Sequence, residues 1–168
     1  MSENIVAIDK QSVDNLLAKL SDTDQKNRWL YEAVMSGART LQQAAQQSFK
    51  QSLGEAASHT SPYIKGGKPF YEGVSVKGDK AYIEATVSIM NDYRMKFFEK
   101  GTADRQTKGR KITGYIDAHH LKREGKGHYT GKITATNFFR SARDNSQSQV
   151  EQAMTDTLNK SISNAIRQ

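Results

Sequence analysis

The amino-acid sequence predicts an α+β fold, with a long helix and a carboxy-terminal helix packed on an antiparallel β-meander and an extended basic loop or arm. Three observations predict this class. Apolar residues repeat with helical periodicity before residue 57 and after residue 145, they alternate with polar residues between 70 and 99, and one stretch holds all the net charge. Because domains average about 150 residues, we expect residues 1–168 to form a single domain.

Composition excludes several classes of protein. The chain has no cysteine, which excludes a disulfide scaffold, a zinc ribbon and thiol catalysis. A membrane span needs roughly 18 consecutive apolar residues, and no such run occurs, so we expect no membrane partner. Glu3 stands where a secretory signal has basic residues, so we expect no signal peptide.

A short amphipathic helix is expected over residues 10–20. Asp9 precedes it and offers a side-chain oxygen that caps the first turn. The apolar residues of this segment follow the i, i+3, i+4, i+7 spacing that places them on one helix face. They are Val13, Leu16, Leu17 and Leu20.

The long helix is expected to begin at residues 21–24, a cluster that offers several N-cap oxygens. Helical periodicity then lasts for about 33 residues, which corresponds to a rod of about 50 Å. The opposite face is rich in glutamine and almost uncharged, so it is either solvated or packed on a neighbouring subunit. Its glutamines are Gln42, Gln43, Gln46, Gln47 and Gln51.

The β-meander is expected after a loop. Residues 59–69 contain both prolines of the chain and a Gly-Gly pair, which cannot continue a helix. The period of the apolar residues then changes to two, which predicts strands over residues 70–76 and 81–89. Gly78 and Asp79 lie between these runs and predict a tight hairpin turn.

A second turn is expected at Asn91 and Asp92, and a third antiparallel strand over residues 93–99. The three strands would cover one face of the long helix.

Regular periodicity then ends, and residues 103–136 predict a long basic insertion that forms an arm. A long stretch without structure inside a compact domain is either functional or disordered. Two short apolar patches within it, residues 112–116 and 129–133, are expected to pair as a loose hairpin.

The carboxy-terminal helix is expected to span about 20 residues. Ser146 or Ser148 is the expected N-cap, and Ser148 with Glu151 fits the spacing of a capping box. One face stays apolar from Val150 to Ile166, which predicts that this helix packs on the same core.

The positive charge is concentrated in one stretch. The chain has 25 Lys and Arg against 18 Asp and Glu, a net charge of +7. Residues 93–132 hold eleven of these bases and four of these acids, so the rest of the chain has 14 of each. We therefore expect a partner to bind this stretch. The expected contact residues are Arg105, Lys108, Arg110, Lys111, Lys122, Arg123, Lys126 and Lys132.

A nucleic-acid-binding module that uses residues 94–132 is the alternative interpretation of this charge. Lys and Arg neutralise backbone phosphates without sequence preference. Tyr115 and Tyr129 interleave aromatic rings with the bases, as stacking platforms for nucleic-acid strands do.

Motifs for catalysis are incomplete. A phosphate-binding loop needs a hydroxyl residue after its Gly-Lys pair, but Pro69 and Gly127 follow the two Gly-Lys pairs that match best. The spacing of Gly125, Gly127 and Gly131 is not that of a dinucleotide fingerprint. We therefore expect no enzymatic activity and no cofactor.

A metal-dependent hydrolase is a third class to consider, because imidazole and carboxylate groups bind zinc and iron. Histidines in a basic loop are more often solvated or in contact with a partner, so we expect no metal. The ligands would be Asp117, His119, His120 and His128.

Two motifs flank the predicted arm. Residues 97–102, Phe-Phe-Glu-Lys-Gly-Thr, are similar to an aromatic-x-Glu-Phe-Gly-Thr strand end, and residues 137–142, Asn-Phe-Phe-Arg-Ser-Ala, to a Pro-Phe-Leu-Arg-Pro-Ala motif. Residues 67–74 stand where a Gly-rich loop leads into the sheet. With these motifs and the order of its elements, the chain resembles the tail-completion or head-to-tail joining (neck) proteins of long-tailed bacteriophages.

This resemblance implies a virion structural protein without catalysis. Its subunits would form a ring, which we expect to be hexameric, at the head–tail junction of the virion, after assembly in the host cytoplasm. The implied partners are the capsid connector or head-completion proteins and the tail-tube or tail-terminator proteins, with the genomic DNA as a further contact.

The motif residues are expected to be fold markers rather than contact sites. Lys100 replaces an aromatic residue of the family motif, and the arm is much longer than in the family, so the role of the arm does not follow from the resemblance. The expected fold markers are Phe98, Glu99, Gly101, Thr102, Asn137, Phe138 and Phe139.

Overall fold

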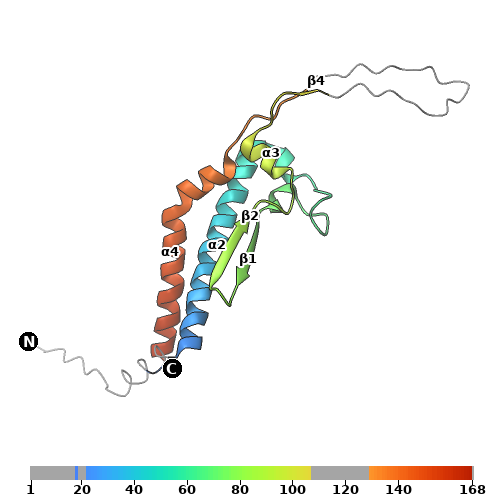
Figure 1. The fold of residues 1–168 in the computed structure, drawn as a ribbon. Coiled ribbons are helices and arrows are strands. Elements are labelled where there is room, and N and C mark those ends of the chain that lie inside the picture. Colours follow the sequence, from blue (N-terminus) through green and yellow to red (C-terminus); the bar gives the residue numbers. More distant parts are fainter. Residues whose placement is uncertain (1–17, 19–21, 107–128, 168) are drawn as a thin grey trace, which may run out of the picture.

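The structure is a computed structural model that describes Ala18 and residues 22–106 and 129–167 (Figure 1). Apart from Ala18, the helix expected over residues 10–20 lies outside these residues.

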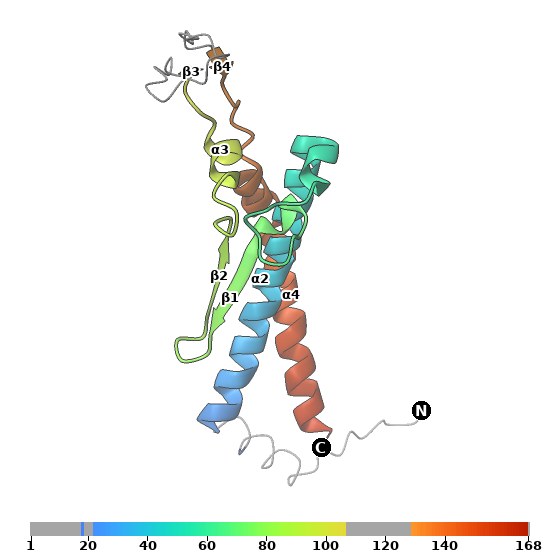
Figure 2. The same ribbon diagram turned by 90° about the vertical axis from the view of Figure 1, so that its right-hand side faces the viewer.

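The fold is α+β, as the sequence predicts. Two long helices, α2 (Thr23–Leu53) and α4 (Phe138–Ile166), lie side by side and run in opposite directions (Figure 1). A hairpin of β1 (Ser75–Asp79) and β2 (Glu84–Ser88) lies along α2 on another side, as Figure 2 shows. The central helix α2 therefore contacts both α4 and the hairpin.

Helix α2 begins where the sequence predicts. The Asp22 carboxylate accepts hydrogen bonds from the backbone N–H groups of Asp24 and Gln25, at 3.0 and 3.3 Å, and so caps the first turn. The helix ends at Gly54, whose φ of 59° lies in the region that favours glycine.

Gly37 allows α4 to approach α2 closely near the middle of α2. A Cβ atom at this position would lie 2.7 Å from Cγ of Met154 and 3.1 Å from Cγ1 of Val150, both on α4. Glycine is otherwise unfavourable inside a helix, so close packing explains its presence here.

Part of the glutamine-rich face of α2 serves the protein's own fold. The side-chain amides of Gln42 and Gln46 donate to the carbonyl oxygen of Val74, at 2.9 and 3.4 Å, just before β1. The other three glutamines of this face are exposed. Packing on a neighbouring subunit stays a prediction for those three.

The hairpin differs from the prediction at its start and at its turn. Residues Phe70–Gly73 form a 3-10 helix, η2, rather than strand, after a preceding 3-10 helix, η1 (Gly54–Ser58). Gly78 lies inside β1, paired with Ala85, and the connection is made by residues 80–83. Glycine is required at position 78 by packing rather than by a turn, since a Cβ atom there would collide with the hydroxyl of Tyr31 on α2.

The prediction of a third strand over residues 93–99 is wrong. Residues 95–100 form a short helix, α3 (Met95–Lys100), so the sheet has two strands rather than three. Asp92 forms the turn that leads into this helix, because its side chain accepts from the N–H of Arg94 and its carbonyl from the N–H of Met95, both at 3.0 Å. The N-cap residue is Arg94, and no side chain caps the helix. The helical turn places the Met95 side chain in the core, where it is fully buried.

The predicted start of the last helix is also wrong. Helix α4 begins at Phe138 and has 29 residues, so Ser146 and Ser148 lie inside it and cap nothing. Ser146 is almost completely buried. The first turns bury Phe138 and Ala142 in the core, and a carboxylate from a distant part of the chain caps them.

The described part of the arm is a narrow ribbon. Strand β3 (Arg105–Gln106) pairs antiparallel with β4 (Tyr129–Gly131), and the ribbon extends away from the helices in both views (Figures 1 and 2). The patch at residues 112–116, which we expected to pair with residues 129–133, lies outside the described residues.

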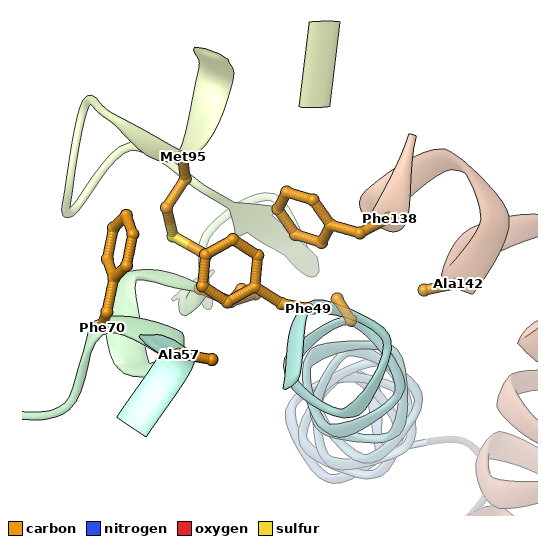
Figure 3. Packing of buried hydrophobic residues seen from close by; sticks show 8 residues of the cluster. Phe49, Ala57, Phe70, Met95, Phe138 and Ala142 are labelled. Atoms are coloured by element: carbon orange, nitrogen blue, oxygen red, sulfur yellow. The ribbon is translucent and has the colours of Figure 1, made fainter. Parts of the chain in front are cut away.

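An aromatic cluster forms the core at the arm-bearing end of the helices (Figure 3). The Phe49 ring, from α2, lies at its centre and is fully buried. Ring centroids of Phe138 and Phe70 lie 4.7 and 5.0 Å from it, and that of Phe98 lies at 6.0 Å. Because these rings come from α2, η2, α3 and α4, the cluster joins the elements from which the arm leaves.

Candidate functional site

Residues 98–102 and 133–137 lie side by side where the arm leaves the body, and we call them the arm root. The N–H of Thr102 donates to the carbonyl of Ile133, and the N–H of Ile133 donates to Thr102 Oγ1, both at 2.9 Å. This reciprocal pair joins the two legs of the arm immediately before they enter the β3–β4 ribbon. The legs therefore leave the body as a pair.

Glu99 caps helix α4 from 40 residues away. Its carboxylate oxygens accept from the backbone N–H groups of Phe139 at 2.8 Å and Arg140 at 3.1 Å. Asn137 occupies the N-cap position in left-handed conformation, and its own side chain makes no capping bond. The first N–H groups of a helix need an acceptor and favour negative charge, so Glu99 supplies both.

Gly101 has a φ of 72°, in the positive region that favours glycine. A Cβ atom here would lie 2.9 Å from both the carbonyl oxygen of Ile133 and the nitrogen of Ala135. Three residues before Gly101, the carbonyl of Phe98 accepts a hydrogen bond from the N–H of Thr136 at 2.8 Å. Conformation and close contact both require glycine at this point of the arm root.

The aromatic residues of the two motifs fix the arm root to the core. Phe138 is fully buried against Phe49, Phe98 is half-buried beside the same ring, and Phe139 packs at the edge of the cluster. These contacts, with those of Glu99, Gly101 and Thr102, give six of the seven expected fold markers a role in the fold, and the seventh, Asn137, supplies the left-handed N-cap position of α4. They account for the motifs without a partner.

Two of the expected contact residues lie in the described part of the arm. Arg105 on β3 and Lys132 after β4 are both exposed. Their positions at the base of the ribbon agree with an arm that carries its charge away from the body. The other six lie outside the described residues: Lys108, Arg110, Lys111, Lys122, Arg123 and Lys126.

The metal-site alternative also falls outside the described residues, since Asp117, His119, His120 and His128 all lie within residues 107–128. Within the described residues, no group of three His, Asp or Glu side chains is arranged to hold a metal ion. The structure therefore gives this alternative no support from elsewhere in the fold.

A buried polar cluster, which sequence reasoning missed, lies beside the arm root. Ser61 and Asp92 are fully buried, and the Ser61 hydroxyl donates to Asp92 Oδ2 at 2.5 Å. Arg94 completes the cluster through Nη2, 2.7 Å from Asp92 Oδ2, and Nε, 3.0 Å from Oδ1. The cluster ties the loop of residues 59–69 to the loop that follows β2.

The charges of this cluster are strongly coupled. Burial by itself raises the pKa of the Asp92 carboxyl, but hydrogen bonds from Arg94 and Ser61 outweigh it and hold that pKa below its ordinary value of 3.8. The hydrogen bond to Asp92 raises the pKa of Arg94 in turn. Arg94, which we counted among the bases of the charged stretch, is therefore neutralised within the fold.

The chemistry of the cluster is structural rather than catalytic. A nucleophilic serine needs an adjacent general base and access for substrate, whereas the Ser61 hydroxyl is fully buried and Asp92 is held as an ionised acceptor of four donor groups. The sequence signal was the Asn-Asp pair, which we interpreted as a turn. Its pairing with Ser61, 31 residues earlier, has no local signature.

Comparisons with known proteins give no relatives: no protein-family model, no curated protein and no solved structure matches the chain. In the described part of the chain, no helix combines the length and the apolar character needed to cross a membrane. The resemblance to phage neck proteins is therefore a prediction that rests on the motifs and the order of elements.

Proposed function

We propose that the protein is a non-enzymatic structural protein of a long-tailed phage virion. Its subunits form a ring, hexameric in our proposal, at the head–tail junction, where they complete or join the tail to the capsid connector. The observation that carries the proposal is the arm root. The two motifs that resemble the neck family meet there, although Glu99 and Phe139 are 40 residues apart in the sequence.

The mechanism is interface formation. The helices and the hairpin form the body of each subunit, and the arm reaches a neighbouring subunit or an adjoining connector or tail protein. A ring repeats the charge of the arm in every subunit, which favours electrostatic steering toward an acidic partner surface. The pairing of Thr102 with Ile133 supports this mechanism, because it sets the direction in which the arm leaves.

The arm faces protein rather than the lumen of the ring in this proposal. A channel lined by so much positive charge would hold DNA instead of letting it slide. The genomic DNA is then a secondary contact. The protein would be assembled in the host cytoplasm and remain in the virion.

The direct test combines oligomeric state with joining. We expect native mass spectrometry and negative-stain images of the purified chain to show closed rings. Particles made without the protein should give tail-less heads together with free tails, and the added protein should restore joining. Monomers that neither bind a connector nor join heads to tails would refute the proposal.

A nucleic-acid-binding module is the second candidate, favoured by the concentration of net charge in residues 93–132. It predicts a monomer that binds duplex DNA with an affinity that falls steeply as salt rises. A salt titration by fluorescence anisotropy distinguishes the two functions. Binding that persists at high salt, or rings that ignore DNA, would argue against it.

A further inference from the structure

Two loops at the arm-bearing end present aromatic and thioether side chains to solvent. Tyr63 projects from the loop of residues 59–69, and Met90 and Tyr93 project from the loop after β2. They are 52%, 58% and 42% exposed. The rings of Tyr63 and Tyr93 contact each other, and we call these two side chains the Tyr63 surface. Exposed apolar groups gathered in one place mark interaction sites more often than scattered ones do.

The Tyr63 surface is held in place by buried residues next to it in the sequence. The buried Ser61–Asp92–Arg94 cluster joins the two loops, so that residues immediately beside Tyr63 and Tyr93 are fixed. The rings of Tyr63 and Tyr93 lie edge to face with centroids 5.0 Å apart, and the neighbouring Tyr63 hydroxyl raises the pKa of Tyr93. Little side-chain freedom remains to be lost on binding.

A hollow of about 390 Å³ adjoins these rings. Its walls are Tyr63, Ile64, Lys65, Lys68, Glu72 and Asn91. The amine of Lys68 is paired with the Glu72 carboxylate at 3.0 Å, but Lys65 forms no ion pair with any carboxylate of the described residues. Lys65 therefore contributes to the lining of the hollow a positive charge that no carboxylate of the described residues pairs with.

The cost of the buried cluster also points to a role for the surface. A buried ion pair is seldom more stabilising than apolar residues of the same volume, because both charges lose their hydration. Arg94 nevertheless lies between the rings of Tyr63 and Phe70, 4.8 and 4.6 Å from their centroids. What this arrangement provides beyond packing is a fixed position for the exposed rings.

We propose that the Tyr63 surface binds an acidic segment of another protein. Tyrosine is enriched in protein interfaces, an apolar side chain of the partner would enter the hollow, and a carboxylate beside it would meet Lys65. This contact is separate from the ring and from the arm, and it holds even if the protein forms no ring.

Nucleic acid fits this surface less well. Bases bind by stacking on open ring faces. The Arg94 guanidinium covers one face of the Tyr63 ring, and Tyr93 stands edge to face with Tyr63 on one side and with Phe97 on the other. One face of the Tyr63 ring is therefore already occupied and is closed to a stacking base.

The test uses the full chain and a fluorescein-labelled dodecapeptide of glutamates with two central leucines. We expect saturable binding by anisotropy, and a loss of at least about tenfold in affinity, or about 1.4 kcal/mol, for both Tyr93→Ala and Lys65→Glu. Lys65 is exposed, so its variant tests the proposal even if Tyr93→Ala folds poorly. Matched controls on the hairpin, Tyr82→Ala and Lys77→Glu, should bind as the parent does.

Three results would overturn the proposal. Unchanged affinity in both test variants is the first. The second is a loss of peptide binding in Lys108→Glu but not in Lys65→Glu, which would assign the peptide to the arm. The third is an oligo-dT strand that binds more tightly than the peptide and is released by Tyr93→Ala, which would make the surface a nucleic-acid site. None of these results depends on whether the protein forms rings.

Discussion

The two ends of the helix pair are stabilised by different means. At the arm-bearing end, large rings around Phe49 and fully buried Met95 fill the space between four elements. Toward the other end, α2 meets α4 through small residues, Ala33 and Gly37, and among the described residues Trp29 is the large side chain buried there. The first end depends on side-chain volume and long-range hydrogen bonds, and the second on close approach of two backbones.

This difference shows which interactions stabilise the attachment of the arm. The hydrogen bonds of Glu99, the Asp92 cluster and the Phe49 cluster all lie at the end from which the arm leaves. Loss of packing at this end should therefore weaken both the fold and the attachment of the arm. Loss of packing at the far end should weaken only the helix pair.

The largest effect is expected from Phe49→Ala. Removal of a fully buried ring leaves a cavity between α2, η2, α3 and α4, and should lower the free energy of unfolding by about 3–5 kcal/mol. Urea denaturation followed by circular dichroism measures it. The control at the other end is Leu30→Ala, which removes a half-exposed side chain and should cost less than about 1 kcal/mol. Equal losses in the two variants would remove the contrast between the ends.

Asp92→Asn comes next, because it leaves the Arg94 guanidinium without its carboxylate. Removing one partner of a buried pair costs about 3–5 kcal/mol, and since the Arg94 side chain is 35% exposed we expect about 2–3 kcal/mol. The matched control is Asp144→Asn, which removes the partner of Arg143 on the exposed surface of α4 and should change stability by less than about 0.5 kcal/mol.

The contribution of Asp92 should also depend on pH. Its pKa is lower in the folded chain than in the unfolded chain, so the stabilisation is complete above an unfolded pKa near 3.8 and is lost as pH falls through the lower, folded value. The difference in unfolding free energy between the parent and Asp92→Asn should therefore shrink below about pH 4. A difference that stays constant in denaturation curves down to pH 2 would contradict this sign.

Local patterns were sufficient for the elements whose stabilisation is local. The periodicity of α2 and its cap at Asp22 were readable in the sequence, and so was the pairing of two strands. The strand predicted over residues 93–99 was wrong because Tyr and Phe favour strands, whereas the structure buries Met95 by turning residues 95–100 into a helix. The turn predicted at Asn91 and Asp92 is present, since the Asp92 carboxylate accepts from the N–H of Arg94, and it precedes the helix without capping it.

Long-range partners set the limit of prediction. The start of α4 depends on a carboxylate, Glu99, that lies 40 residues before Phe139, and nothing in the local sequence signals that bond. The two motifs were recognised as fold markers, but the bonds that join them were not predictable. The same is true of Ser61 and Asp92, whose roles exist only once two loops have been brought together.

A smaller effect is expected from Gly37→Val at the far end. The new side chain would press on Met154 and Val150 and move α4 outward, at a cost of about 1–2 kcal/mol. Gly37→Ala should be nearly neutral, because its gain in helix propensity, about 1 kcal/mol, offsets a milder collision. The amide exchange rate of Phe139 should be the same in both variants. Faster exchange there in Gly37→Val would mean that the two ends are not independent.

The smallest and most local effect is expected from Glu99→Gln. The amide keeps one acceptor oxygen but loses the second, together with the negative charge at the first turn of α4, so we expect a loss of about 0.5–1 kcal/mol. Hydrogen exchange measured by NMR should speed up at the N–H groups of Phe139 and Arg140, while amides beyond the first turns of α4 keep their protection. Glu151→Gln, on the exposed middle of α4, should leave these rates unchanged. If Glu99→Gln left them unchanged too, the long-range cap would contribute nothing, and α4 would begin at Phe138 through burial of that ring alone.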